Sequence, residues 1–361
     1  MSTNPVEFLS ELVAIESLSG EETAVAQFLA AHMAQLGLAA HIDGAGNAVG
    51  VREEGGENGR ITREIILLGH MDTVPGRVPV RVADGKVYGR GAVDAKGPLA
   101  TFVLAAARAK LPPGTRLVVI GATEEEAATS KGARFAATRY RPDMCIIGEP
   151  SGWDGVTLGY KGRVLIDYAY SQPMSHTAGQ ASGAAETGIA WLNQFTSYIA
   201  AYNQTRPRLF DQLLPSIRDI HTGSDGLTNT INIKLGVRLP PEFDVAGLGT
   251  AVREMAGRAS LRFYGHEAAF QSTRQTPLAR AFNRAIRQAG AKPTFKLKTG
   301  TSDMNVVGPI WQCPIVAYGP GDSSLDHTPE EHVVVDEYLQ AIDVLQHVLE
   351  VIGTERLRGD D

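Results

Sequence analysis

The sequence predicts an α/β protein in which a larger domain, with a sheet covered by helices, is interrupted by a smaller α+β domain. Two observations lead to this prediction. Short runs of Ile, Leu and Val with little alternation are followed by helix-like stretches, which is typical of strands covered on both faces. The chain also has 361 residues, which is long for a single hydrophobic core, so two domains are expected.

Strands and helices of the larger domain are expected to alternate. Ser19 and Glu22 have the spacing of a helix capping box, and apolar residues from Val25 to Leu36 recur at helical spacing before Gly37. A strand, a helix, a strand, a helix and a strand are then expected at residues 65–68, 99–109, 117–120, 131–138 and 144–147. A helix at 278–289, a strand at 315–318 and a helix at 336–352 follow the insertion.

The pattern changes near Gly162, where the inserted domain is expected to begin. Strands are predicted at residues 164–170, 230–239 and 260–270, and helices at 185–202 and 245–258, which together form a β-α-β-α-β block. We therefore expect residues 163–273 to form the smaller domain. Residues 1–162 and 274–361 are expected to form the larger, discontinuous one.

Composition narrows the classes of function. The formal net charge is −6 with both signs mixed, which gives no electrostatic reason to expect nucleic-acid binding. No apolar run approaches the roughly 20 residues that span a bilayer, and the N-terminal residues lack the basic and apolar parts of a signal peptide. Two cysteines, Cys145 and Cys313, are expected to be core residues and not a disulfide. A soluble cytoplasmic protein without a membrane partner is expected.

Acidic residues and histidines follow several predicted strands. His70 and Asp72 come after residues 65–68, three glutamates come after residues 117–120, and Glu149 comes after residues 144–147. Ligands of such sheets bind beyond the carboxyl ends of the strands. Charges at a buried strand end must be paired or bound to metal, because bare carboxylates are costly to desolvate.

The candidate ligands are typical of a site for two divalent metals. Such sites hold the metals about 3.5–4 Å apart, and a carboxylate with one oxygen on each metal is the usual bridge. The chain offers five candidates: His70, Asp94, Glu126, Glu149 and His327. Histidines and carboxylates without cysteine suit zinc or a similar first-row metal. Asp72 could accept the other N–H of the His70 imidazole and fix its tautomer. The alternative, unrelated surface groups, is disfavoured because most of the candidates lie at strand ends.

Five motifs, in order along the whole chain, resemble those of the M20 metallopeptidase family. They are His70-Met71-Asp72, the segment from Gly89 to Gly97, Glu124-Glu125-Glu126, the segment from Gly148 to Ser151, and the segment from Asp326 to Glu331. The resemblance implies a zinc-peptidase-like catalytic domain with a mixed sheet, an inserted dimerisation domain, and hydrolysis of an amide bond. It also implies two divalent metal ions per chain, with Zn²⁺ favoured and Co²⁺ or manganese as alternatives.

The same resemblance assigns roles to the candidate residues. Asp94 would bridge the metals, His70 and Glu149 would complete one site, and Glu126 and His327 would complete the other. Counting back from Gly132 favours Glu125 as the general base, and a shift by one residue would make it Glu124.

Further residues are implied outside the metal site. His176, in the inserted domain, would reach the partner subunit's site in a homodimer and stabilise the oxyanion, although Gly179-Gln180 departs from the family's usual proline-containing continuation. Substrate contacts would come from five residues: Asn229, Arg238, Gly300, Thr301 and Ser302. Arg238 could hold a substrate carboxylate with its guanidinium fork, or equally form a structural ion pair.

Two loops resemble the lysine/ornithine branch of the family. They run from Thr123 to Arg134 and from Gly148 to Gly162. This branch releases lysine or ornithine from an N-acetylated form or from an amino-group carrier protein, in amino-acid biosynthesis. Two alternatives stay open. One is another M20 hydrolase, such as an acetylornithine deacetylase, a succinyl-diaminopimelate desuccinylase or a dipeptidase, and the other is a catalytically silent relative that binds or regulates.

Overall fold

The computed structural model describes residues 4–174 and 182–352. The chain divides into two compact units. The larger unit comprises Met1–Gly159, Gln271–Leu297 and Ser302–Asp361, and the smaller unit comprises Tyr160–Phe270 and Lys298–Thr301. The short segment Lys298–Thr301, which the sequence assigns to the larger domain, is thus grouped with the smaller unit.

The larger unit is built on a mixed sheet. In the described residues this sheet has nine strands, in the order β1-β2-β6-β3-β7-β15-β8-β13, with β14 paired to β8. Strand β3 is parallel to β6 and β7, and β15 is parallel to β7. The strands are β1 (Ala39–Ile42), β2 (Ala48–Glu54), β3 (Arg63–His70), β6 (Thr115–Ala122), β7 (Met144–Gly148), β8 (Gly155–Tyr160), β13 (Phe270–Gln271), β14 (Thr294–Lys298) and β15 (Ile315–Tyr318). The expected α/β class with a mixed sheet is confirmed.

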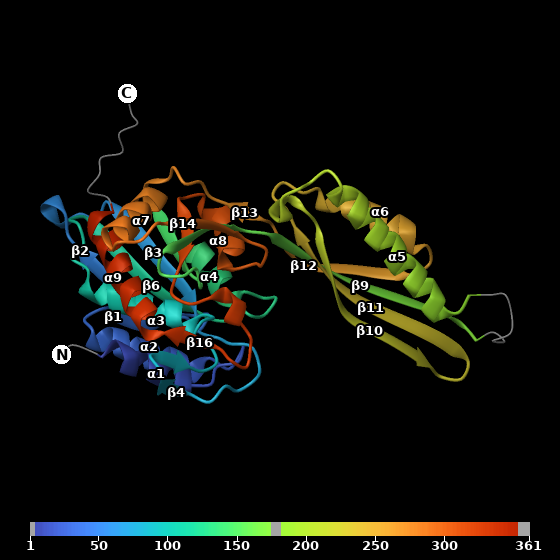
Figure 1. The fold of residues 1–361 in the computed structure, drawn as a ribbon, viewed down its shortest axis with the longest axis horizontal. Helices are drawn as coiled ribbons and strands as arrows, with labels where there is room; N and C mark the ends of the chain where they lie inside the picture. Colours follow the sequence, from blue (N-terminus) through green and yellow to red (C-terminus); the bar gives the residue numbers. More distant parts are fainter. Residues whose placement is uncertain (1–3, 175–181, 353–361) are drawn as a thin grey trace, which may run out of the picture. The chain divides into compact units, whose positions relative to one another are not determined.

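Helices pack against this sheet (Figure 1). One core joins Ile65 and Leu67 of β3 to α1 (Pro5–Ala14), α2 (Thr23–Gln35), α3 (Lys96–Arg108), α7 (Pro277–Gln288) and α9 (Val335–Val351). The intervening residues Ile66 and Leu68 are equally buried and point to the opposite face, because side chains alternate along a strand. Helices α4 (Lys131–Arg139) and α8 (Asp303–Trp311) contact each other and the strands β6 and β15 respectively. Near-continuous apolar strands therefore reflect burial on both faces.

A second, small sheet joins segments that lie far apart in the sequence. Strand β16 (His332–Val334) pairs antiparallel with β5 (Lys86–Tyr88), which pairs with β4 (Arg81–Ala83). Short 3₁₀ helices lie at Glu57–Gly59 and Ser323–Leu325. The pairing of His332 with Tyr88 brings the segment that follows His327 beside the segment that leads to Asp94.

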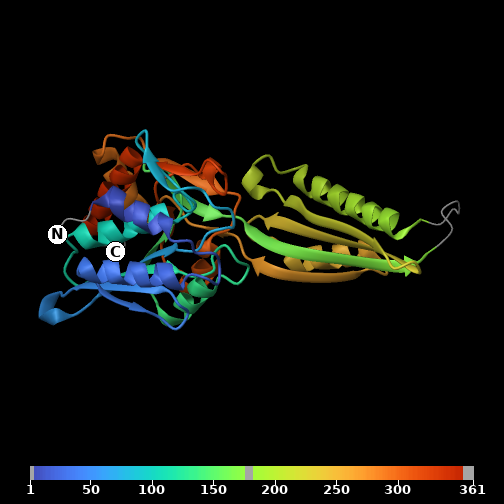
Figure 2. The ribbon, with the colours of Figure 1, turned by 90° about the horizontal axis from the view of Figure 1, so that it is seen from below.

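The smaller unit is an antiparallel sheet with two helices on one face (Figures 1 and 2). Its strands β9 (Gly162–Pro173), β10 (Leu214–Ser224), β11 (Thr228–Leu239) and β12 (Ser260–Glu267) lie in the order β10-β11-β9-β12. The helices α5 (Ala184–Asn203) and α6 (Val245–Ala256) share a hydrophobic core with β9 and β11, and a 3₁₀ helix lies at Leu209–Asp211. The predicted β-α-β-α-β block lacked β10, because that strand is exposed along nearly its whole length and carries no apolar run.

The predicted capping box is wrong, and its residues serve another purpose. Helix α2 begins at Thr23, and no side chain caps its N-terminus. Ser19 instead donates a hydrogen bond to Asp72 (2.7 Å), and Glu22 accepts one from the backbone N–H of Glu124 (3.0 Å). A local spacing rule fails here because two long-range hydrogen bonds compete for the same side chains.

Two other expectations concern the cysteines and the membrane. Cys145 is a free, buried thiol on β7, and Cys313 is a free, partly buried one. Among the helices of the described residues, none combines the length and the apolar character needed to cross a bilayer.

Candidate metal centre

Two groups of candidate ligands come together in the larger unit, and they share one carboxylate. The His70 group consists of His70, Asp94 and Glu149, and the His327 group consists of Asp94, Glu126 and His327. Within each group, one potential ligand atom from every residue lies within 4.8 Å of the others. The five residues that the sequence singled out as ligands therefore lie side by side. Asp94 is the residue that the two groups share, and its role as a bridge stays a prediction.

Strand ends and loops supply these residues in different ways. His70 is the last residue of β3, and Glu149 directly follows β7. Glu126 lies four residues beyond the end of β6. Because β3 is parallel to both of its neighbours, β6 and β7, the carboxyl ends of the three strands lie at one edge. Asp94 and His327 come from loops, the first before α3 and the second between the 3₁₀ helix Ser323–Leu325 and β16.

The shared carboxylate contacts both histidines through different oxygens. His70 Nε2 lies 3.2 Å from Asp94 Oδ1, and His327 Nε2 lies 3.0 Å from Asp94 Oδ2. His327 Nε2 also lies 2.9 Å from Glu126 Oε1. Each oxygen of Asp94 is thus turned toward one group, which is the arrangement that two adjacent cations need.

Asp72 contacts one ligand, His70, and the segment that carries another, Glu126. Its side chain is fully buried, and His70 Nδ1 lies 3.1 Å from its backbone oxygen and 3.4 Å from its Oδ1. The carboxylate accepts hydrogen bonds from the backbone N–H groups of Glu125 (3.1 Å) and Glu126 (3.0 Å) and from Ser19 Oγ (2.7 Å). Asp72 therefore orients the His70 ring and holds the glutamate segment at the same time.

The three consecutive glutamates point to different neighbours. Glu124 has a φ of 58° and accepts a hydrogen bond from Thr129 Oγ1 (2.6 Å), with Lys131 Nζ at 3.5 Å. Glu126 faces His327. Glu125 lies within the electrostatic reach of His70 and Glu149. Glu124 is thus outside both ligand groups, while Glu125 lies close to them without belonging to either.

The charges of the centre shift its protonation equilibria. Hydrogen bonds with Asp94 and Glu126 raise the pKa of His327 to about 10, against the opposing effect of burial. Burial lowers the pKa of His70, but its hydrogen bonds with Asp72 and Asp94 outweigh that effect and bring the pKa well above its usual value. A cation bound here would compete with protonation of both imidazoles, because only the neutral ring binds metal.

Glu125 behaves in the opposite way from a surface carboxylate. Burial raises the pKa of Glu125 well above its usual range, and His70 opposes this shift. The neighbouring carboxylates of Glu149, Asp303 and Glu126 raise the pKa further. A carboxyl group with a raised pKa can both accept and donate a proton near neutrality.

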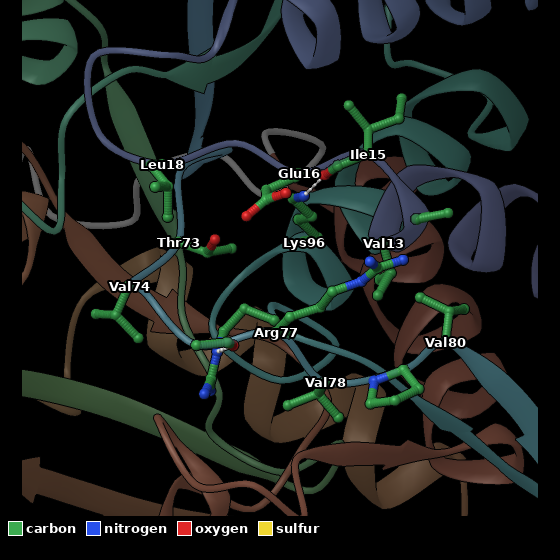
Figure 3. A pocket seen from close by; sticks show the side chains of 14 residues that line it. Val13, Ile15, Glu16, Leu18, Thr73, Val74, Arg77, Val78, Val80 and Lys96 are labelled. Atoms are coloured by element: carbon green, nitrogen blue, oxygen red, sulfur yellow. Dashed lines mark hydrogen bonds between the residues drawn. The ribbon is translucent and has the colours of Figure 1, made fainter.

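A buried lysine, Lys96, follows Asp94 by two residues and lines a cavity of about 420 Å³ (Figure 3). Lys96 is 1% exposed, and its ammonium donates to the backbone oxygen of Ile15. Burial lowers the pKa of Lys96 to about 8, against the opposing charges of Asp72, Glu331 and Glu16. Lys96 thereby ties the start of α3, two residues beyond Asp94, to the segment that follows α1.

The sequence assigns Glu331 no role beyond its place in a motif. The structure shows a fully buried carboxylate that accepts hydrogen bonds from the backbone N–H groups of Gly91, Val93 and Asp94 and pairs with Arg90 at 2.6 Å. The only signal in the sequence was an acidic residue shortly before a short apolar strand. Such a signal is too common to identify a function.

The predicted substrate contacts lie mostly in the smaller unit. Arg238 Nη1 donates to Thr301 Oγ1 (2.9 Å). Asn229 lies nine residues earlier on the same strand, opposite Gln172, so it is about 30 Å from Arg238 along β11. Gly300 belongs to the same short segment as Thr301, whereas Ser302 is buried and caps α8 by accepting from Met304. His176 lies outside the described residues.

Comparisons with known proteins point to one family. The pattern of "Peptidase family M20/M25/M40" matches residues 66–351. A protein of Deinococcus radiodurans named LysW-lysine hydrolase is 47% identical over 353 residues, which cover 95% of each chain. A protein of Saccharolobus islandicus strain L.S.2.15 named LysW-lysine/LysW-ornithine hydrolase is 28% identical over 278 residues, which cover 76% of this chain and 77% of the relative.

Solved structures resemble the chain in fold. The M20 family metallo-carboxypeptidase Sso-CP2 of Sulfolobus solfataricus has a TM-score of 0.79 at 17% identity, over 98% of this chain and 100% of the other. The YxeP protein of Bacillus subtilis, described as a dinuclear metal-binding peptidase of the M20 family, has a TM-score of 0.72 at 13% identity, over 97% and 98% of the two chains.

Proposed function

Because this chain belongs to the peptidase family M20/M25/M40, we propose that it is a two-metal amidohydrolase that releases lysine or ornithine from a carrier-protein-linked or N-acetylated form. One observation carries the proposal. The two oxygens of Asp94 face two separate ligand groups, each completed by one histidine and one glutamate. Five ionisable groups that are buried or half-buried thus lie in close contact, and two bound cations would balance their charges.

We propose Zn²⁺ as the metal, with Co²⁺ as the alternative. The donor set, with histidine nitrogens and carboxylate oxygens and without cysteine, suits both ions. Divalent metals bound here would supply polarisation of the acyl oxygen and a water whose pKa is lowered toward about 7. The protonated histidines would have to lose their protons first, because only the neutral imidazole binds metal.

Glu125 is proposed as the general base. It lies close to both ligand groups, and its raised pKa suits a group that takes a proton and later returns it. Glu125 would accept a proton from the attacking water and pass it to the leaving amine nitrogen, so that the amide bond breaks to a carboxylate and an amine. Its backbone N–H donates a hydrogen bond to Asp72 (3.1 Å), which holds the backbone of this residue next to His70.

A homodimer with a shared active site is proposed for the assembly. The edge strand β10 exposes Ile217 (58%) and Ile220 (41%) together with its outer row of backbone groups, which is a surface that a second copy can cover. Asn229 lies opposite Gln172, four residues before His176 in the chain. Because Asn229 is about 30 Å from Arg238 along one strand, a small substrate could contact both only if they came from different copies.

The shared site has a direct test. Chains with His176→Ala are mixed with chains carrying Glu125→Gln, each inactive alone. Hybrid dimers should regain part of the activity, because one of their two sites would combine an intact Glu125 with an intact His176. Mixtures that exchange subunits but stay inactive would refute the role of His176 across the dimer.

The substrate proposal rests on the relatives. Proteins named LysW-lysine hydrolase and LysW-lysine/LysW-ornithine hydrolase cover most of the chain, and we propose the same carrier-linked amino acids here, in a cytoplasmic biosynthetic route. Turnover is to be compared for carrier-linked lysine, carrier-linked ornithine, N-acetyl-lysine, N-succinyl-diaminopimelate and a dipeptide, with metal content measured beside it. Preferential hydrolysis of a lysine or ornithine compound is expected. Equal or absent turnover of these would contradict the proposed substrate class.

A further inference from the structure

We propose that Glu331 and Arg90 form a positioning pair that holds the Asp94 and His327 loops in register, so that its loss weakens metal binding by the His327 group much more than by the His70 group. This inference rests on the proposed two-metal function. It assigns a task to two residues that would not touch either the metals or the substrate. The pair connects segments about 240 residues apart in the sequence.

One oxygen of Glu331 organises the loop that carries the shared ligand. Glu331 Oε1 accepts hydrogen bonds from the backbone N–H groups of Gly91 (2.9 Å), Val93 (3.0 Å) and Asp94 (3.1 Å). The loop therefore wraps around a single acceptor. Because Glu331 is fully buried, water cannot replace it without reorganisation of the loop.

The other oxygen reaches the second loop through Arg90. Glu331 Oε2 lies 2.6 Å from Arg90 Nη1, and the guanidinium also donates to the backbone oxygens of Thr328 (3.3 Å), His327 (3.5 Å) and Gly76 (2.9 Å). The backbone of Glu331 adds a bond, since its oxygen accepts from Gly89 N–H (3.2 Å). Arg90 is thus hydrogen-bonded to the backbone of His327, whose imidazole belongs to the second ligand group.

The two ligand groups depend on this pair to different degrees. His70 ends β3 and Glu149 follows β7, so the hydrogen bonds of the sheet hold both near their positions. His327 has a φ of 62°, which a non-glycine residue adopts only where its surroundings hold it, and its side chain is 48% exposed. The conformation of the His327 loop therefore relies on side-chain contacts that the strand-end ligands do not need.

Glu331→Gln tests the pair with little change in shape. The amide oxygen can still accept from the three backbone N–H groups, but the amide nitrogen cannot accept from Arg90 and places two donors against each other. Stepwise binding of Zn²⁺ to the chelator-stripped full chain is measured by calorimetry. We expect one of the two metals to bind about 10–100-fold more weakly, the range for loss of a group that orients a ligand, with the other changed less than about threefold.

The weakened site is assigned by comparison with ligand variants. The binding curve of Glu331→Gln should resemble that of His327→Ala and differ from that of His70→Ala. With Co²⁺ as the probe, the absorption spectrum of the second metal should change while that of the first is retained. Glu330→Gln is the matched control, since Glu330 is the exposed neighbour and its variant should bind both metals like the wild type.

Arg90→Lys is a second test of the positioning pair, because it keeps the charge but loses the guanidinium group that bonds to both Glu331 and His327. If Glu331→Gln does not fold, as thermal unfolding of the metal-free protein would show, Arg90→Lys decides the question. Equal weakening of both metals, or no weakening of either, overturns the positioning role. A wild-type chain that binds fewer than two metals overturns the two-metal proposal and this inference together, whereas two bound metals without lysine turnover would leave this inference standing and reject only the substrate.

Discussion

The two ligand groups share Asp94 but are built on different supports. The His70 group is largely buried and stands on the ends of the parallel strands β3 and β7. The His327 group includes an exposed histidine and is assembled from loops. Strand ends are fixed by the hydrogen bonds of the sheet, while loop residues need side chains to hold them. We therefore expect the His70 group to bind metal more tightly and to exchange it more slowly.

The shared carboxylate gives the largest expected effect, because it belongs to both groups. Asp94→Ala should reduce the metal content below one ion per chain and lower kcat/KM by more than about 1,000-fold, since the metal-activated water is lost. Elemental analysis beside kinetics checks this. Asp343→Ala, at an exposed aspartate with only a distant contact to Arg108 (3.9 Å), should leave both quantities unchanged. Retention of both metals in Asp94→Ala would refute the bridging position.

The paired histidine variants test the difference between the groups. His327→Ala should lose one metal and keep the other near wild-type affinity, whereas His70→Ala should weaken the tighter-binding metal by more than about 100-fold, beyond the effect of losing a merely orienting group. Calorimetric titration of each variant measures both steps. If His327→Ala weakened both metals equally, the two groups would not be independent sites.

The pH dependence of metal binding follows from the raised pKa of His327, about 10. Below that pH, one proton must leave the imidazole for each metal bound, so the affinity of the His327 group should rise about tenfold per pH unit between about pH 7 and 9. Calorimetry in buffers of different ionisation heat measures the released proton.

The same shift has a consequence for the metal-free protein. The interactions of protonated His327 with Asp94 and Glu126 stabilise the folded state fully below about pH 6.5, the ordinary pKa of histidine. This contribution is lost as the pH rises toward the raised pKa of about 10. The loss should be small, because the side chain of His327 is half exposed. If metal binding at pH 8 released no proton, the ion pairs of His327 with Asp94 and Glu126 would be contradicted.

The smallest expected effect concerns the support that both groups receive from Asp72. Ser19→Ala removes the hydrogen bond from Ser19 Oγ to Asp72 (2.7 Å), which should cost about 0.5–1.5 kcal/mol of stability and lower kcat/KM only a few-fold. Chemical unfolding and kinetics of the metal-loaded protein measure these changes. Ser197→Ala, on the exposed side of α5, should alter neither. An effect as large as that of His327→Ala would mean that Ser19 does more than hold Asp72.

Much of the fold could be predicted from runs of apolar residues in the sequence. The runs at 65–68, 117–120 and 144–147 became β3, β6 and β7, because strands buried on both faces leave a continuous apolar record. Strand β10 left no such record, since its side chains are almost all exposed. The prediction of a capping box at Ser19 and Glu22 was wrong, because both side chains form hydrogen bonds with residues more than 50 positions away.

The sequence by itself determined the α/β class with its mixed sheet and named the five residues that lie together in the two ligand groups, because apolar strands, ligand types and the order of motifs can all be read along the chain. Only the tertiary structure decided which oxygen of Asp94 faces which histidine, and only it revealed Glu331 and Arg90. The physical reason is the range of the interactions. A buried carboxylate must satisfy its charge with whatever donors the fold brings to it, and here those donors lie about 240 residues away.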